Sequence, residues 1–185
     1  SKKEDVMRFE RKAYQIRLSR LCSTIFSPGK IQALILCDLN NIRYMTGFTG
    51  SDGVLVIQPQ KATLLVDGRY LTQARGEVQN TDLYLYQDKV EAIEAVLDLR
   101  DEDLIGFEAQ AVSYEFYLKL ADRLRMERLT PLSGELNVLR AVKDEGEVSS
   151  LRRAAELAGS VLETVLRTIR PGISERDLAV EIDFG

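Results

Sequence analysis

The chain has 185 residues, of which 45% are hydrophobic and 29% charged, a balance that predicts a globular protein long enough to bury a substantial core. Its formal net charge of −4 at pH 7 argues against a nucleic-acid-binding protein, because such proteins usually carry a basic excess. No apolar run approaches the roughly 18 residues needed to cross a bilayer, so we expect neither nucleic acid nor membrane among its partners.

Histidine is absent from the sequence, and cysteine occurs only at Cys22 and Cys37. This composition excludes a Ser-His-Asp triad and an imidazole-ligated zinc site from this stretch, and two thiolates are too few for an all-cysteine zinc site. Both cysteines lie in apolar surroundings, which predicts free thiols in the reducing cytoplasm.

Carboxylates cluster at residues 98–103 and again at 144–147. The first group lacks the glycine-punctuated spacing of a calcium loop, and the second suits the first turn of a helix, where carboxylates interact favourably with the helix dipole. We interpret both groups as structural. We therefore expect no catalytic residue, no metal ligand and no cofactor in this chain.

The first third of the chain begins with a charged segment whose apolar residues recur at helical spacing. This pattern predicts an amphipathic helix over residues 3–25 with an apolar face of Val6, Phe9, Ala13, Ile16 and Leu21. The apolar run 31–39 predicts a buried strand, and residues 40–53 are predicted to form a polar, glycine-bearing loop. The runs 54–58 and 62–67 predict an antiparallel hairpin.

Beyond the hairpin the pattern changes to alternating helices and strands. In chain order it predicts a helix at 69–78, a strand at 82–87, a helix at 90–100, a strand at 103–108, a helix at 113–125 and a strand at 127–132. Ser113 is a suitable N-cap for the last of these helices. Strands flanked by helices predict an α/β domain with a mixed β-sheet over residues 1–133.

A different pattern begins after residue 133. One long helix is predicted over 144–169, with an apolar stripe of Val148, Leu151, Ala155, Ala158, Leu162, Val165 and Ile169. Pro171-Gly172 ends it, and Ser174 begins a second helix with Asp177 three residues further on. No predicted element covers the apolar faces of these helices. We therefore interpret residues 134–185 as the opening of a second domain and expect the chain to self-associate.

Three glycines, Gly47, Gly50 and Gly53, occur in the predicted loop. Their spacing matches neither of the common nucleotide-binding loops, and no lysine follows. A strand rather than a helix comes next, so no helix dipole points into the loop. The pattern favours tight turns over phosphate binding.

A second polar motif, Asp67-Gly68-Arg69-Tyr70, closes a predicted strand and opens a predicted helix. Asp67 is able to cap that helix, and Gly68 permits a positive φ. The guanidinium of Arg69 is able to clamp a carboxylate through two parallel hydrogen bonds. A structural role is favoured for the motif, and the role of Asp67, Arg69 and Tyr70 stays open.

Four stretches together resemble one known family. They are NIRYMTGFTGS at 41–51, DGRY at 67–70, LRAVKDEGEVSSLRRAAELA at 139–158 and IRPGISERDLA at 169–179. Their order and setting are similar to those in Xaa-Pro dipeptidases and aminopeptidases P. The resemblance implies a creatinase/prolidase-like N-terminal domain over 1–133, followed over 134–185 by a linker and the first helices of an incomplete pita-bread catalytic domain.

The resemblance also implies an activity for the parent protein. Such a parent hydrolyses Xaa-Pro peptide bonds with two divalent metal ions (manganese, cobalt or zinc). In the family the metal ligands lie downstream of the helix that corresponds to the last one predicted here, so we expect this chain by itself to be inactive. The family further implies a homodimer and a cytoplasmic location.

In relatives, loops of the N-terminal domain reach the partner's active-site mouth. By resemblance, the 41–51 segment is the candidate for this role, with Asn41, Arg43, Tyr44 and Phe48 as its contact residues. An alternative is that Ile42, Tyr44 and Phe48 anchor the segment on its own core, and the composition of the segment does not separate the two.

Two other functions fit the same resemblance. In the first alternative, the chain is part of a non-catalytic binding or scaffolding module that keeps a peptidase-like fold. In the second, it is part of a creatine amidinohydrolase. Fold alone does not decide between these and the peptidase.

Overall fold

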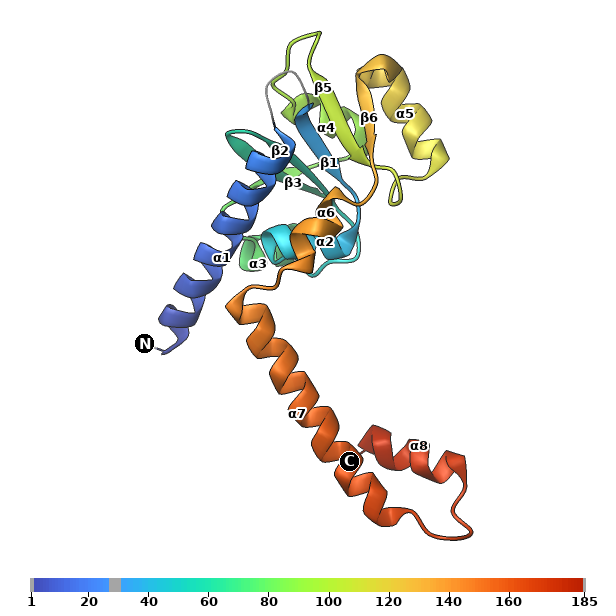
Figure 1. Ribbon diagram of the computed structural model, residues 1–185. Helices are drawn as coiled ribbons and strands as arrows, with labels where there is room; N and C mark the ends of the chain where they lie inside the picture. The colour runs from blue at the N-terminus through green and yellow to red at the C-terminus, as the bar shows by residue number, and fades with distance from the viewer. Residues whose placement is uncertain (1, 27–30, 185) are drawn as a thin grey trace. The chain divides into compact units, whose positions relative to one another are not determined.

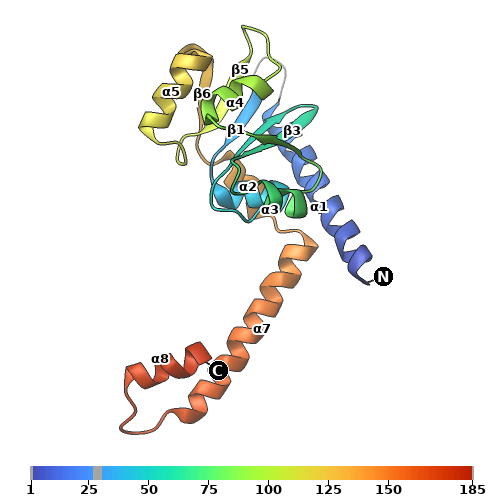
Figure 2. The ribbon, with the colours of Figure 1, turned by 180° about the vertical axis from the view of Figure 1, so that it is seen from behind.

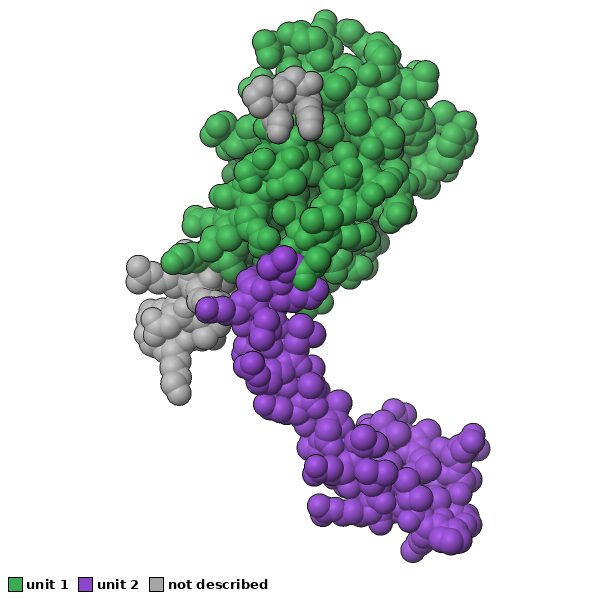
Figure 3. Space-filling model, in the orientation of Figure 1, with its two compact units in different colours: residues 1–141 green, residues 142–185 purple. Residues whose placement is uncertain are grey.

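The computed structural model describes residues 2–26 and 31–184, and it describes the side chains of residues 12–26 and 31–183. The chain forms two compact units, residues 1–141 and residues 142–185 (Figure 3). The first unit extends beyond the predicted domain boundary at residue 133, because the helix that follows packs into its core.

Among the described residues, the first unit contains six strands in one sheet with the order β4-β3-β2-β1-β5-β6 (Figure 1). The strands are β1 Ile31–Leu36, β2 Val54–Gln58, β3 Lys61–Val66, β4 Asp82–Leu85, β5 Leu104–Glu108 and β6 Leu129–Leu132. Strand β2 pairs antiparallel with β1 and β3, and all other neighbouring strands pair parallel. The mixed sheet flanked by helices confirms the predicted fold class.

Strands β2 and β3 form a hairpin inside the sheet, between β4 and β1. The antiparallel pairing confirms the predicted hairpin, but β3 begins one residue earlier than predicted, so that Gln58 pairs with Lys61 across a two-residue turn. All of β2 is buried, because helices cover both faces of the sheet.

Helices cover the two faces of the sheet unequally. On one face lie α1 Lys2–Ile25, α2 Leu39–Thr46, α3 Leu71–Glu77 and α6 Glu135–Ala141, whose apolar side chains share one core. On the other lie α4 Lys89–Val96 and α5 Tyr114–Leu124, the latter followed by the 3-10 turn η1 Met126–Arg128 (Figure 2). Adjacent residues of a strand contribute to opposite cores, as Leu34 and Ile35 show.

Three details differ from the predicted elements. The segment 40–53 is not entirely a loop, because its first half forms α2 between an Asp38 N-cap and a Gly47 C-cap. Helix α6 was not predicted, and it buries Leu136 and Leu139. In α1, Ile16 is half exposed although the predicted apolar face included it, whereas Leu21 is buried as expected. The side chains of Val6 and Phe9 lie outside the described set.

The second unit consists of α7 Glu145–Thr168 and α8 Glu175–Phe184. Asp144 and Glu147 form a capping box at the start of α7, each side chain accepting a hydrogen bond from the other residue's backbone N–H. Ser174 and Asp177 form the same arrangement before α8, as predicted. The two helices contact each other, but α7 buries only Val165 among its described side chains.

Neither α7 nor any other helix in the described part of the chain is both long and apolar enough to span a membrane.

Candidate functional site

The polar side chains of the first unit gather where three parallel strands end. Strands β1 and β3 both run antiparallel to β2, and β5 runs parallel to β1, so β1, β3 and β5 end at the same edge of the sheet. Asp38 follows β1, Asp67 follows β3, and Glu108 is the last residue of β5. Asp52 lies just before β2, at the same edge. We call this edge, with its four acidic residues, the carboxyl edge.

One group of side chains at the carboxyl edge surrounds Arg69. The guanidinium of Arg69 donates from Nε and Nη2 to Oδ2 of Asp67, at 2.9 and 2.7 Å. Its Nη2 also lies 3.7 Å from Oδ2 of Asp52. Asp52 accepts in addition from Nζ of Lys89 at 2.7 Å and from Oη of Tyr86 at 2.9 Å. We call these five residues the Arg69 cluster.

The ionisation of the two aspartates in the Arg69 cluster follows from these contacts. Burial by itself would raise the pKa of Asp52, but the hydrogen bonds from Lys89 and Tyr86 outweigh it and hold that pKa below its usual value. The hydrogen bonds from Arg69 lower the pKa of Asp67. Both carboxylates are therefore ionised at neutral pH, and their two negative charges are balanced by the positive charges of Arg69 and Lys89.

The Arg69 cluster adjoins the second half of the 41–51 segment. Oγ of Ser51 and Oη of Tyr70 are 2.5 Å apart, and the rings of Phe48 and Tyr70 meet edge to face with centroids 6.0 Å apart. Thr49 donates from its backbone N–H and its hydroxyl to Glu77 of α3, at 2.8 and 2.7 Å. Two motifs that are separate in the sequence are thus in direct contact.

Glycines shape the backbone between these contacts. Gly47 ends α2 with φ of +82°, a conformation that L side chains rarely adopt. A Cβ atom on Gly50 would meet the ring of Phe48, so the close approach of ring and backbone requires glycine there. These roles agree with the interpretation of the glycines as turn residues.

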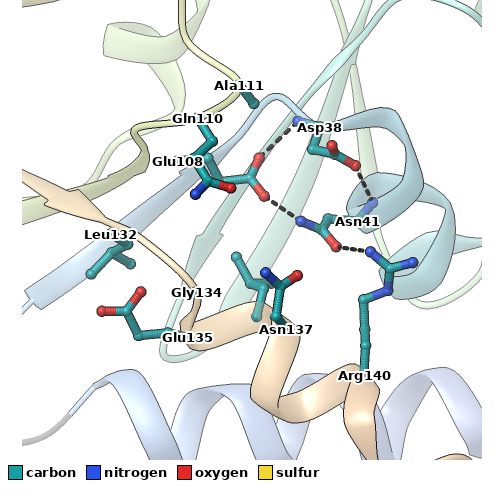
Figure 4. Close-up of a pocket in the computed structure, with 11 residues that line it drawn as sticks. Asp38, Asn41, Glu108, Gln110, Ala111, Leu132, Gly134, Glu135, Asn137 and Arg140 are labelled. Carbon is teal, nitrogen blue, oxygen red and sulfur yellow. Dashed lines mark hydrogen bonds between the residues drawn. The ribbon is translucent and has the colours of Figure 1, made fainter.

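A second group at the carboxyl edge surrounds Glu108 (Figure 4). Oε2 of Glu108 accepts from the backbone N–H groups of Cys37 and Asp38 at 2.6 and 2.7 Å, and Oε1 accepts from Nδ2 of Asn41 at 2.5 Å. Oδ1 of Asn41 then accepts from Nη1 of Arg140 at 3.0 Å. We call Glu108, Asn41 and Arg140 the Glu108 network.

Burial dominates the electrostatics of the Glu108 network. The side chain of Glu108 is 6% exposed, and burial raises its pKa even though three hydrogen bonds favour the carboxylate. Burial and the charge of Glu108 together raise the pKa of the Cys37 thiol to about 12. Both Cys37 and Cys22 are free thiols, as predicted.

The structure places the predicted contact residues of the 41–51 segment unevenly. Asn41, Tyr44 and Phe48 are buried, and Arg43 is exposed on α2. Tyr44 packs under the guanidinium of Arg17, whose carbon lies 4.2 Å from the ring centroid. Burial of Ile42, Tyr44 and Phe48 favours the alternative in which they anchor the segment on its own core. The role of the segment at a partner's active site stays a prediction.

The contacts of the 67–70 motif differ from those that were expected. Asp67 does not cap α3, since its carboxylate accepts from the backbone and side chain of Arg69 instead. Gly68 does not adopt a positive φ. Arg69 nevertheless keeps an exposed side chain (69%), held in place by Asp67 from one side.

Sequence reasoning missed Asp38, Asp52, Glu108 and Arg140 as members of these groups. Each of the first three stands at an end of a strand, which is the signal that was available. The proximity of Asp38 and Glu108 depends on the pairing of β1 with β5, which hydrophobic periodicity does not specify. Arg140 lies on the helix that was not predicted.

The described residues contain no group of three or more His, Cys, Asp or Glu side chains that could hold a metal ion. The carboxylates of the carboxyl edge are instead held by N–H, ammonium and guanidinium donors. This arrangement braces the ends of strands and presents exposed polar side chains.

Residues 17–142 match the model of the creatinase/prolidase N-terminal domain, which covers more than half of the chain. The chain belongs to this family. As a member it resembles the uncharacterized peptidase YqhT of Bacillus subtilis, with 31% identity over 86% of this chain and 46% of the relative. The chain spans about half the length of the curated relatives that match most of its residues.

Solved structures give the same assignment. The Xaa-Pro dipeptidase from Bacillus anthracis superposes with a TM-score of 0.81 at 28% identity, over 92% of this chain and 48% of that one. The aminopeptidase P structure from Streptococcus thermophilus superposes with a TM-score of 0.63 at 29% identity. It aligns with 69% of this chain, and 98% of its own chain is covered. The creatinase/prolidase N-terminal fold thus accounts for the first unit.

Proposed function

We propose that this chain is the N-terminal, accessory part of a proline-specific metallopeptidase, an Xaa-Pro dipeptidase or aminopeptidase P. The observation that carries the proposal is the family match over residues 17–142, joined to the similarity with the Bacillus anthracis Xaa-Pro dipeptidase over 92% of the chain. Proline lacks an N–H and has a fixed φ, so bonds before proline require a dedicated peptidase.

In this proposal the metal centre belongs to the parent rather than to this chain. Two divalent metal ions (manganese, cobalt or zinc) would supply an activated water for attack on the peptide carbonyl. The residues present here do not fit such a centre, because the sequence lacks histidine and the described side chains form no acidic metal site. The chain alone is expected to be inactive.

The contribution of this chain is to present α2 and the loop after it. Asn41, Tyr44 and Phe48 fix the backbone from inside, while Arg43 is left on the surface. In a homodimer of the cytoplasmic parent, this segment would lie at the mouth of the partner's active site. Arg43 would then add positive charge where a peptide enters.

The test uses the full-length parent and two arginine variants. Arg43→Ala removes the exposed charge on α2, and Arg100→Ala removes an exposed charge from the connection that precedes β5, at the opposite edge of the sheet. We expect the parent with Mn²⁺ to cleave an Xaa-Pro peptide in preference to its Xaa-Ala analogue. We expect Arg43→Ala to lower kcat/KM severalfold and Arg100→Ala to leave it unchanged.

Two results would contradict the proposal at different points. Equal cleavage of the two peptides, or none of the Xaa-Pro peptide, would refute the proline-specific activity. Equal kinetics for the two arginine variants would refute the role of α2 at the active-site mouth while leaving the activity in place.

A further inference from the structure

Strands β1 and β5 are parallel neighbours whose outgoing connections diverge. After β1 the chain enters α2 on one face of the sheet, and after β5 it enters α5 on the other face. Such a divergence opens a crevice at the carboxyl ends of the two strands, where doubly wound α/β proteins commonly bind ligands.

In this protein the crevice is filled by the chain's own side chains. The carboxylate of Glu108 accepts from the two N–H groups that precede α2, a position in which a helix start often holds a bound anion. Arg140 of α6 closes the crevice from the other side (Figure 4). The space left is a pocket of about 70 Å³, well below the roughly 300 Å³ at which small-molecule sites begin.

The amide of Asn41 has one orientation in this arrangement. An ionised carboxylate only accepts hydrogen bonds, so Glu108 requires Nδ2 of Asn41 on its side. Oδ1 is thereby turned toward Nη1 of Arg140. Arg140 of α6 thus donates to Asn41 of α2, and Asn41 donates to Glu108 at the end of β5.

Helix α6 depends on these contacts for its order. It has seven residues, and isolated helices of that length are unstable in water. It docks through Leu136 and Leu139 into the core shared with α1 and α2, and Arg140 stands beside Leu139 in its last turn. Arg140 is therefore placed to couple the docking of α6 to the start of α2.

We propose that the Glu108 network is a latch that couples α6, the last helix of the first unit, to α2, which carries Arg43. Asn41 and Arg140 are its positioning residues, and neither needs to touch a substrate. Release of α6 then loosens the N-terminal turn of α2. The functional consequence for Arg43 rests on the proposed peptidase role, but the coupling itself does not.

The test is amide hydrogen exchange, followed by mass spectrometry, on the 185-residue chain and three variants. Arg140→Met removes the donor and keeps an apolar stem of similar length. Arg140→Lys keeps a single donor and is the milder variant if Arg140→Met does not fold. Arg123→Met, the matched control, removes an arginine from an exposed ion pair with Glu94 on the other face of the sheet.

For Arg140→Met we expect exchange to rise roughly tenfold or more in α6, as follows from losing a hydrogen bond to a charged donor, and severalfold in α2. Arg140→Lys is expected to raise both rates by less, and Arg123→Met to change neither. Exchange that rises in α6 alone would overturn the proposal, because Arg140 would then dock α6 without coupling it to α2. Unchanged exchange in both helices would overturn it as well.

Exchange is measured without substrate, so failure of the latch and failure of the peptidase assignment are distinguishable. In the full-length parent, Arg140→Met is expected to lower kcat/KM by the same mechanism as Arg43→Ala. Combining the two substitutions should then cost less than the product of their separate effects. A fully multiplicative result would show that Arg140 does not act through α2.

Discussion

The two units of this chain differ in how much of their apolar surface they bury. The first buries apolar side chains on both faces of a sheet, in two cores. The second holds its helices by caps and a short mutual contact, and Leu151, Leu157, Leu162 and Leu166 are each more than half exposed. The first unit therefore has a self-contained core, whereas the second buries Val165 but leaves these four leucines of α7 exposed.

The largest expected difference between the units is the effect of truncating a leucine. Leu34→Ala empties a fully buried site in the first unit and should lower the free energy of unfolding by about 2–5 kcal/mol. Leu162→Ala, on the exposed face of α7, should change it by no more than about 0.5 kcal/mol. Urea denaturation of both variants measures the contrast. Comparable losses would mean that α7 is buried in solution.

Self-association provides a second contrast. The exposed leucines of α7 are expected to drive concentration-dependent association of the chain, which light scattering detects. The double variant Leu151→Glu, Leu162→Glu should shift the chain toward monomer. As a control matched in charge, Ser150→Glu with Ser160→Glu adds two carboxylates at exposed polar positions of α7. A wild-type chain that stays monomeric at all concentrations would contradict this interpretation of the second unit.

Removing a cap should affect the second unit alone. Asp144→Ala deletes one half of the capping box before α7 and should destabilise that helix by about 0.5–2 kcal/mol. The expected result is a loss of helical circular dichroism without a shift in the main unfolding transition. A matched loss in that transition would show that the two units unfold together.

The smallest expected effect is a pH dependence within the first unit. Burial raises the pKa of Glu108 in the folded state, so this group's contribution to stability is fully present below its unfolded pKa of about 4.3 and is lost as pH rises through the folded value. Relative to Glu108→Gln, the wild type should therefore gain stability as the pH falls from 7 toward 4. A difference between the two proteins that does not vary with pH would contradict the raised pKa.

Much of the first unit was predictable from the sequence, because its strands are short apolar runs bounded by turn residues. Helix α2 was missed because half of its eight residues are polar and a glycine-bearing loop follows it, although Asp38 and Gly47, its caps, mark both ends. Helix α6 was missed because its residues were assigned to the linker that follows residue 133.

The candidate site was less predictable than the fold. The contact between Ser51 and Tyr70 joins two predicted motifs, but their proximity follows from the pairing of β2 with β3. The Glu108 network gathers residues as far apart as Asn41 and Arg140, and no local pattern brings these together. Long-range strand order decides the Glu108 network, whereas the contact between Ser51 and Tyr70 follows from a local hairpin.

We propose that this chain is the accessory part of an Xaa-Pro peptidase whose metal centre is formed by other residues of the parent. The most direct measurement compares hydrolysis of an Xaa-Pro peptide by the 185-residue chain and by the full-length parent, each with Mn²⁺ and then with a chelator. We expect the parent with Mn²⁺ to hydrolyse the peptide and to lose this activity on chelation, and we expect no hydrolysis by the 185-residue chain under either condition. Turnover by the chain alone, or parent activity that survives chelation, would contradict the proposal.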